Sequence, residues 1–407
     1  MTRARDKVLL AMSGGVDSSV AAALLLRAGY DVVGCFMRLG SPGETLETMT
    51  RDEGGACTTG TAGVSGGVSA GVSGGGVKVG HQGCCSINDA ADARQVAAEL
   101  GIPFYVVNFK RDFGRVISYF VDEYVRGRTP NPCVRCNDWL KFGKLHDYAV
   151  QIGATHVASG HYARIDREGT SPRLMRGVDH SKDQSYVLFG APRERLASML
   201  LPIGEMEKPR VRDLARELGL PVFDKPDSQE ICFVPDNDYA GLVERVAPEQ
   251  ARPGPIVNER GEVVGTHAGQ HRFTVGQRRG VKLALGTPAY VLERDAATNT
   301  VRIGPPEALD VGSLIASEAN WLTDPPAPGQ TRVCLARYRS NGRAVPARVR
   351  TLAPLGADQP SPSGRHERFE VVFEEPQRAV APGQAVVLYD ASEPDWVIGG
   401  GWIASVT

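Results

Sequence analysis

Three cysteines lie in segments whose composition suits chemistry at sulfur. Cys133 and Cys136 stand three positions apart in the Pro-rich segment TPNPCVRCN (residues 129–137), and Cys232 lies in DSQEICF (residues 227–233). Basic residues stand near the first pair: Arg126, Arg128, Arg135 and Lys141. Nearby cations favour the thiolate, which is the reactive form of cysteine. No second Cys-x₂-Cys pair follows, so the spacing favours reactive thiols over a structural zinc site.

A second reactive feature is the loop SGGVDSS at residues 13–19, which lies between an apolar run and an Ala- and Leu-rich segment at 20–28. A strand, a Gly-rich turn and a helix in this order leave backbone N–H groups at the helix start available to phosphate. Gly14 and Gly15 allow close backbone approach, and Asp17 would position Mg²⁺ on a pyrophosphate. Because no P-loop lysine follows, the loop favours adenylation over γ-phosphate transfer.

Strands and helices are predicted to alternate through the first part of the chain. Short apolar runs predict strands at residues 7–12, 32–37, 104–109 and 155–159. Apolar residues at helical spacing predict helices at 20–28, 89–100 and 113–124, and the polar segment 127–137 is predicted to be a loop. This alternation indicates an α/β fold with a parallel, doubly wound sheet.

The composition changes twice along the chain. Residues 54–80 contain eleven glycines and one charged side chain, too little apolar surface to order themselves, so we expect a surface insertion over 41–82. From residue 253 onward, short β-rich runs separated by turns predict a small central domain and a C-terminal β-barrel. The expected domains are residues 1–233, with central-domain residues beginning near 202, then 234–285 and 286–407.

The overall composition is that of a soluble globular protein, with 42% hydrophobic residues, 23% charged residues and a net charge of −1. No apolar run of about 18 residues occurs, so neither membrane insertion nor secretion is expected. Eight cysteines without an apolar leader indicate reduced thiols and a cytoplasmic location. Two basic segments without an acidic residue, 263–292 and 331–350, are expected to contact RNA phosphates, and Tyr338 to stack on an unpaired base.

Seven motifs occur in order along almost the whole chain: SGGVDSS (13–19), FM (36–37), GRTPNPC..CN (127–137), GHYAR (160–164), KDQSY (182–186), DSQEICF (227–233) and FTVGQRRG (273–280). The first loop alone resembles that of the PP-loop ATP pyrophosphatases. Together the motifs resemble the tRNA-specific 2-thiouridylase (MnmA/TrmU) family. The resemblance implies a doubly wound PP-loop catalytic domain of the adenine nucleotide alpha hydrolase-like kind, a small central domain and a C-terminal β-barrel.

The resemblance also implies roles for individual residues. Cys136 would be the nucleophile, Cys232 would carry a persulfide, and Asp17 would take part in catalysis. The target base would border Asn131, Pro132 and Cys133. The ATP site would comprise Ala11, Met12, Ser13, Gly14, Gly15, Val16, Asp17, Ser18, Met37 and Gly160. The residues matched to tRNA contacts are His161, Lys182, Asp183, Gln184, Arg337, Tyr338 and Gln384.

The implied reaction is ATP-dependent adenylation of a uridine C2 carbonyl at tRNA position 34, followed by transfer of a persulfide sulfur. Its products are 2-thiouridine, AMP and pyrophosphate, and a Cys136–Cys232 disulfide remains on the protein. The implied partners are ATP, Mg²⁺, tRNAs of the Lys, Glu and Gln type, and a persulfide-carrying donor protein.

Other interpretations stay open at the level of sequence. Many relatives have Asp where Cys133 stands, and three thiolates at 133, 136 and 232 are also able to hold an iron–sulfur cluster. A PP-loop amidotransferase or ligase would need ATP without paired cysteines, and a non-catalytic RNA-binding iron–sulfur protein would retain the loop without turnover. Without the family, His161 is interpreted as a structural histidine, and Lys182 with Asp183 as a solvated charge pair.

Overall fold

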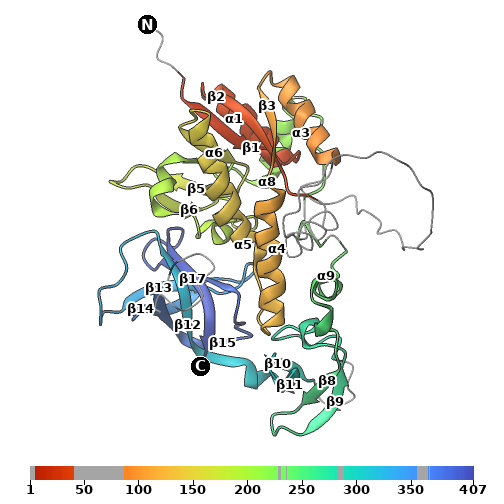
Figure 1. Cartoon of the computed structure of the whole chain (residues 1–407). Coiled ribbons are helices and arrows are strands. Elements are labelled where there is room, and N and C mark those ends of the chain that lie inside the picture. The colour runs from red at the N-terminus through yellow and green to blue at the C-terminus, as the bar shows by residue number, and fades with distance from the viewer. Residues whose placement is uncertain are drawn as a thin grey trace, which may run out of the picture.

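The computed structural model describes residues 5–40, 87–227, 231–234, 236–281, 288–354, 365 and 367–407 (Figure 1). The Gly-rich insertion expected over 41–82 lies outside the described residues. The same holds for residues 228–230 of the DSQEICF motif.

The first part of the chain folds around a five-stranded sheet in the order β3-β2-β1-β4-β7. All neighbouring strands in it run parallel. The strands are β1 (Lys7–Ala11), β2 (Asp31–Arg38), β3 (Phe104–Asn108), β4 (His156–Ser159) and β7 (Met199–Leu200). The first four coincide with the apolar runs of the sequence, and the predicted α/β fold class is confirmed.

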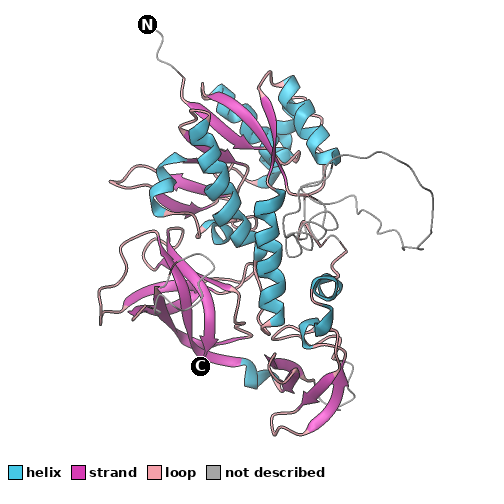
Figure 2. Cartoon of the chain, in the orientation of Figure 1, coloured by secondary structure: helices cyan, strands magenta, loops and turns pink. Residues whose placement is uncertain are grey.

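Helices cover both faces of this sheet (Figure 2). Val8 and Leu10 of β1 pack with helices α1 (Val16–Arg27), α3 (Ile87–Glu99) and α8 (Lys208–Glu217). Leu9 points to the other face and packs with α4 (Lys110–Val125) and α6 (Leu145–Gln151). Burial on both faces explains why the strand is a continuous apolar run without polar alternation. Among the described residues, no helix has the length and apolar character needed to cross a membrane.

The segment that carries Cys133 and Cys136 is helical from residue 132, so the prediction of a loop over 127–137 is wrong for its second half. Helix α5 (Pro132–Arg135) continues directly into a π-helix (Cys136–Lys144) and then into α6. The Asn131 side chain accepts a hydrogen bond from the Val134 N–H at 3.4 Å, and proline occupies the first helical position. Both features start a helix, which the Pro-rich composition concealed.

Shorter elements connect the sheet to the rest of the chain. A hairpin of β5 (Ala163–Asp166) and β6 (Arg173–Arg176) follows β4. Among the described residues, the remaining helices are α7 (Ser185–Leu188), α9 (Tyr239–Val246) and 3₁₀ turns at Arg193–Ser198, Pro248–Gln250, Gln270–Arg272 and Pro306–Leu309. Helix α4 runs from the parallel sheet toward the central unit and packs against α9 there (Figure 1).

The central unit is a four-stranded sheet in the order β10-β11-β8-β9. Its strands are β8 (Gly254–Val257), β9 (Val263–His267), β10 (Tyr290–Asp295) and β11 (Thr300–Gly304). Because β10 and β11 pair within this sheet, we propose that the central domain extends to about residue 305, beyond the predicted boundary at 285.

The last part of the chain forms a closed barrel, as predicted, in the order β12-β15-β14-β13-β16-β17. Its strands are β12 (Asp310–Trp321), β13 (Arg332–Arg337), β14 (Val345–Leu352), β15 (Arg368–Arg378), β16 (Ala385–Asp390) and β17 (Val397–Val406). In β16, Val386 and Leu388 point into the barrel, whereas Ala385, Val387 and Tyr389 belong to the hydrophobic cluster that also contains residues of α4 and the π-helix. The barrel therefore shares a hydrophobic core with the catalytic domain.

Candidate active site

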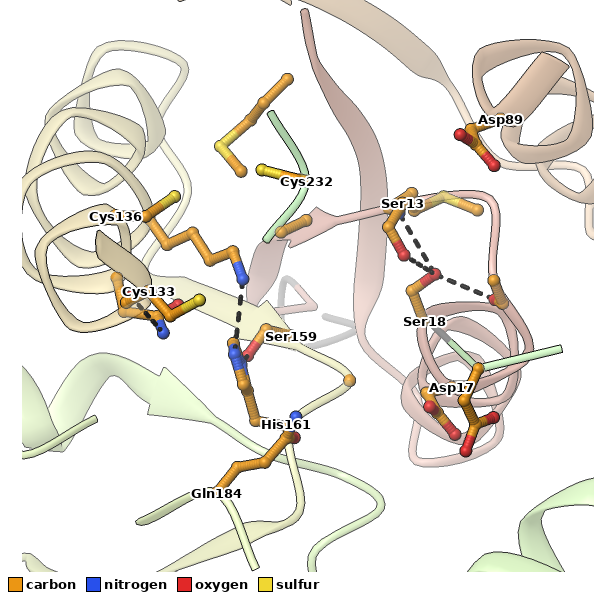
Figure 3. Close-up of a pocket in the computed structure, with 18 of the residues that line it drawn as sticks. Ser13, Asp17, Ser18, Asp89, Cys133, Cys136, Ser159, His161, Gln184 and Cys232 are labelled. Carbon is orange, nitrogen blue, oxygen red and sulfur yellow. Dashed lines mark hydrogen bonds between the residues drawn. The ribbon is translucent and has the colours of Figure 1, made fainter. Parts of the chain in front are cut away.

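A cavity of about 520 Å³ opens at the carboxyl ends of β1 and β4 (Figure 3). The strand order reverses between these two strands, and ligands of open α/β sheets bind at such a point. The loop after β1, the turn after β4, the helix from Pro132, and residues 225–227 and 231–233 all contribute to its walls. The predicted site residues that line it are Ala11, Met12, Ser13, Gly15, Val16, Asp17, Ser18, Met37, Pro132, Cys133, Cys136, Gly160, His161, Lys182, Gln184 and Cys232.

The loop between β1 and α1 is shaped to receive phosphate. Gly15 caps α1 without a side-chain hydrogen bond, so backbone N–H groups of the first turn remain available to an anion. Ser18 Oγ accepts from the Ser13 N–H at 3.2 Å and donates to the Gly15 carbonyl at 3.1 Å, which closes the turn. Gly14 has a φ of +74°, and a Cβ there would lie 2.1 Å from the Asp89 carbonyl oxygen.

Gly160 lets the turn after β4 approach this loop closely. A Cβ on Gly160 would lie 2.7 Å from the Ser18 nitrogen and 2.7 Å from the Asp17 carbonyl carbon. Because these are backbone atoms at the start of α1, a side chain at 160 would push the two walls of the cavity apart. The predicted place of Gly160 at the nucleotide site thus has a steric basis.

Asp17 lies in a network that the sequence did not predict. Both of its carboxylate oxygens accept hydrogen bonds from Lys208 Nζ at 2.8 Å, and the Tyr162 hydroxyl donates to Oδ1 at 2.7 Å. Lys208 Nζ also lies 2.8 Å from Asp227 Oδ1. Burial tends to raise the pKa of Asp227, but hydrogen bonds from Lys208 and Lys182 outweigh it and lower the pKa to about 2.

A second lysine approaches the loop from the segment after α8. Lys225 Nζ donates to the Gly14 carbonyl oxygen at 3.0 Å and to Asp89 Oδ1 at 2.7 Å. Burial would lower its pKa, but hydrogen bonds to Asp89 and Asp92 raise the pKa overall. Lys208 and Lys225 both line the cavity, so two cations face the space beside the phosphate loop.

The three candidate thiols line the same cavity but differ in exposure. Cys133 is exposed, whereas Cys136 and Cys232 are half-buried. In Figure 3, Cys232 points from its segment toward the helix that carries the other two. Among the described residues, no group of three or more His, Cys, Asp or Glu side chains is arranged to hold a metal ion.

Two other cysteines show what an inert thiol looks like in this fold. Cys35 in β2 and Cys334 in β13 have no exposed surface. Burial raises the pKa of each to about 12, so both stay protonated at neutral pH. The contrast separates structural thiols from those at the cavity.

A buried histidine orients a lysine at the cavity. Lys141 Nζ lies 3.4 Å from His161 Nε2, and His161 Nδ1 lies 2.7 Å from Ser159 Oγ. An ammonium group only donates, so Nε2 accepts and Nδ1 carries the proton. Burial, together with the charge of Lys141, holds the pKa of His161 well below its usual range. His161 is therefore neutral and fixes the position of the Lys141 cation.

The π-helix turns Lys141 and Cys136 toward the same cavity. In a π-helix residue i bonds to residue i+5, so these two residues, five positions apart, lie on the same side of the helix. The other basic residues expected near the thiols have different partners. Arg126 and Arg128 contact Glu123, and Arg135 is buried against Glu318 of the barrel at 2.8 Å.

Several residues predicted to bind lie behind the cavity and support its walls. Asn131 caps α5, and Gln384 Nε2 donates to the carbonyl oxygens of Thr129 and Pro130 at 3.1 and 2.9 Å. Asp183 pairs with Arg337 at 2.8 Å, while Lys182 pairs with Asp227 at 2.9 Å, so Lys182 and Asp183 do not form the charge pair that sequence alone suggested.

Tyr338 is likewise part of the barrel. Its side chain is buried, its ring packs edge-on against Phe373, and its hydroxyl donates to Gln377 Oε1 at 3.2 Å. The ring is therefore covered by protein in this structure. Its contact with tRNA stays a prediction, as do those of Asp183, Arg337 and Gln384.

The cavity-lining residues that sequence reasoning missed include Tyr162, Lys208, Lys225 and Asp227. Tyr162 and Asp227 stand inside the motifs GHYAR and DSQEICF, which gave a signal for them. The two lysines lie outside every motif, and their importance arises from ion pairs to residues more than a hundred positions away.

A parallel sheet with a Gly-rich phosphate loop at its switch point, followed by a central sheet and a closed barrel, defines a PP-loop nucleotide-binding protein with two appended β units. Family models match the same three parts in order. The tRNA methyl transferase HUP domain matches residues 6–66 and 70–236. The tRNA methyl transferase PRC-barrel domain matches 242–305, and the aminomethyltransferase beta-barrel domain matches 311–403.

Relatives match over nearly the whole chain. The chain is 45% identical to the tRNA-specific 2-thiouridylase MnmA of Rhodopirellula baltica, over 98% of this chain and 96% of that protein. The MnmA of Geotalea uraniireducens is 45% identical over 98% and 95%, and that of Symbiobacterium thermophilum 44% over 98% and 92%. The chain belongs to the tRNA-specific 2-thiouridylase MnmA family.

Proposed function

We propose that this protein is an ATP-dependent tRNA 2-thiouridylase that replaces the C2 oxygen of a uridine with sulfur. The observation that carries the proposal is that Cys136 and Cys232 line the same cavity as the phosphate loop. Activation by ATP and transfer of sulfur would therefore act on one base held in one place. The volume of about 520 Å³ falls in the range of small-molecule sites, which is about 300 to 1,000 Å³.

The residues of the loop fit the triphosphate of ATP. The first turn of α1 supplies backbone N–H donors. Lys208 and Lys225 line the same cavity, where each is paired with two carboxylates, and each would be available to a phosphate oxygen when that pairing is exchanged. Mg²⁺ is usually held by one or two carboxylates together with phosphate oxygens, and Asp17 is a carboxylate suited to that role. ATP supplies an adenylyl group, which converts the C2 oxygen of uridine into a leaving group.

Sulfur transfer follows in two balanced steps. The terminal sulfur of a Cys232 persulfide attacks C2 of the adenylated uridine, and AMP departs with the former C2 oxygen. The Cys136 thiolate then attacks Cys232 Sγ, the S–S bond to the transferred sulfur breaks, and 2-thiouridine is released. A Cys136–Cys232 disulfide remains, which a reductant must open before the next turnover.

The substrate base must leave its stack to reach this cavity, because neither the loop nor the thiols are able to approach a stacked base. We propose the wobble uridine 34 of tRNAs of the Lys, Glu and Gln type, bordered by Asn131, Pro132 and Cys133. Exposed arginines of the barrel, such as Arg339, Arg343 and Arg348, would contact the tRNA backbone. A persulfide donor protein would load Cys232 in the reducing cytoplasm.

The competing functions account less well for the site. An amidotransferase or ligase would not need two thiols beside the phosphate loop. An iron–sulfur cluster on Cys133, Cys136 and Cys232 gains no support from the described residues, in which no three-ligand group is assembled. Methyl transfer, which the domain names mention, likewise gives no reason for a Cys136–Cys232 pair.

The test is mass spectrometry of nucleosides after incubation of the protein with unmodified tRNA, ATP, Mg²⁺ and a persulfide source. We expect 2-thiouridine with the wild type and with Cys334→Ala, a control thiol inside the barrel. Cys136→Ser and Cys232→Ser should yield none. Equal 2-thiouridine from either of these two variants would refute the proposed roles, and its absence from the wild-type reaction would refute the function.

A further inference from the structure

Cys133 has a place in the fold that the two-thiol reaction does not use. It stands three residues before Cys136 at the start of the same helix, and both line the cavity. In an α-helix, residues i and i+3 have Cα atoms about 5 Å apart. A disulfide requires a Cα separation of roughly 4.4 to 6.8 Å. Cys133 and Cys136 are thus spaced so that a bond between them needs little backbone movement.

Cys133 is more exposed to solvent than the other two thiols of the cavity. Cys133 lines the cavity and is exposed, whereas Cys136 and Cys232 are half-buried. Cys136 therefore has one potential partner, Cys232, on another segment at the cavity and a second, the exposed Cys133, on its own helix (Figure 3). A disulfide between Cys136 and Cys232 would be hard for an external reductant to reach, and one between Cys133 and Cys136 would be accessible.

The backbone that carries Cys133 is fixed, so that only its side chain needs to turn. The Asn131 cap starts the helix, and Gln384 of the barrel holds the two preceding carbonyl groups. The Cys133 carbonyl oxygen accepts a hydrogen bond from Asn137 Nδ2 at 3.1 Å. Rotation about the Cys133 side chain would be enough to bring its sulfur toward Cys136.

We propose that Cys133 is the resolving thiol of the reaction. Its thiolate attacks Cys136 Sγ of the Cys136–Cys232 disulfide, a Cys133–Cys136 bond forms, and Cys232 leaves as a thiolate ready to accept new sulfur. This exchange moves the disulfide without net oxidation. A dithiol reductant of the thioredoxin class then supplies two electrons at Cys133, becoming a disulfide itself. The inference rests on the proposed function.

The experiment is peptide mapping of disulfides after one turnover. Protein loaded with persulfide is mixed anaerobically with tRNA and ATP, without reductant, and the thiols are alkylated in acid. We expect the wild type and Cys334→Ala to carry a Cys133–Cys136 disulfide that depends on tRNA and ATP. Cys133→Ser should carry the Cys136–Cys232 disulfide instead, in at least tenfold excess over the wild type.

The outcomes separate this inference from the function on which it rests. If 2-thiouridine forms but the wild-type disulfide remains between Cys136 and Cys232, or involves any other cysteine, Cys133 is not the resolving thiol. If no 2-thiouridine forms in the same reaction, both the proposed function and the inference are refuted.

Discussion

Lys141 and His161 illustrate how a charged group is held in position at a buried site. A neutral histidine donates to Ser159 and accepts from Lys141, so the ammonium group has one fixed partner and faces the cavity beside Cys136. An anion in this cavity, whether thiolate or phosphate, would gain a charge-assisted hydrogen bond worth about 1.5 to 3 kcal/mol. Burial of a neutral His161 therefore fixes the Lys141 ammonium group where an anion in the cavity is able to accept its hydrogen bond.

Replacing Lys141 with methionine should slow 2-thiouridine formation in a single turnover by roughly tenfold to a hundredfold, the equivalent of that lost interaction. Lys144, on the same π-helix, is a matched control because it is exposed and lies 3.8 Å from Asp112. Lys144→Met should stay within about twofold of the wild type. Equal rates of 2-thiouridine formation in the two variants would show that Lys141 does not assist the reaction.

His161 should make the protein less stable in mild acid. Burial and the charge of Lys141 hold its folded pKa well below the usual histidine value of about 6.5, so as the pH falls below about 6.5 the unfolded chain binds a proton that the folded chain does not. Stability should therefore decrease from pH 7 to pH 5.5. Urea unfolding should show a shallower decrease for His161→Gln than for the wild type. A variant with an unchanged or steeper decrease would contradict the neutral, buried state.

Part of this site could be predicted from residues alone. The phosphate loop and the thiols stand in short motifs, so local spacing identified them. The Asp17–Lys208 and Asp89–Lys225 pairs join distant segments, and no local pattern encodes them. Tyr338 was expected to stack on RNA because it stands among arginines, but it directly follows β13 and its ring packs against Phe373 of the barrel.

Among the elements, the helix that carries Cys133 and Cys136 and the turn after β4 form two walls of the cavity beside the phosphate loop. Near the end of the π-helix, Arg195 donates to the carbonyl oxygens of Phe142 and Gly143, which ties this segment to the 3₁₀ turn at Arg193–Ser198. The strands were predictable because each is a compact apolar run. The start of α5 was not, because proline and asparagine are typical of both loops and helix starts.

Gly160→Ala should weaken ATP binding by at least tenfold. The added Cβ would overlap backbone atoms of Asp17 and Ser18, and the start of α1 would have to shift away from the turn after β4. Gly169→Ala is a suitable control, since its nearest contact would be 3.9 Å away in the β5–β6 hairpin. Calorimetric titration with ATP measures both. Unchanged affinity in Gly160→Ala would place the nucleotide elsewhere.

At the scale of the whole molecule, the barrel holds the helix that carries the thiols. The Arg135 guanidinium makes two hydrogen bonds to Glu318, at 3.1 and 2.8 Å, and lies 3.8 Å from the ring centre of Trp402. Glu318 has a φ of +52°, an uncommon conformation that its fixed partner helps to maintain. The order of the three domains was predictable from the motifs and from the change to short β-rich runs after residue 253. The docking of the parts was not, because it depends on single residues such as 135 and 318.

Glu318→Ala should lower the free energy of unfolding by about 3 to 5 kcal/mol, because Arg135 would remain buried without its partner. A double-mutant cycle with Arg135→Met should recover part of the loss. Asp213→Ala, which removes an exposed ion pair with Arg216, should change stability by less than about 0.5 kcal/mol. If Glu318→Ala and Asp213→Ala lower the free energy of unfolding equally, the Arg135–Glu318 ion pair does not hold the barrel to the catalytic domain.

We propose that sulfur carried on Cys232 reaches an ATP-activated uridine within one cavity. The most direct measurement loads the protein with radioactive persulfide sulfur, removes the donor, and follows the label after tRNA, ATP and Mg²⁺ are added. We expect the label lost from the Cys232 peptide to equal the label gained as 2-thiouridine. Omission of ATP should stop the transfer. Label that stays on the protein while unlabelled 2-thiouridine forms would contradict this proposal.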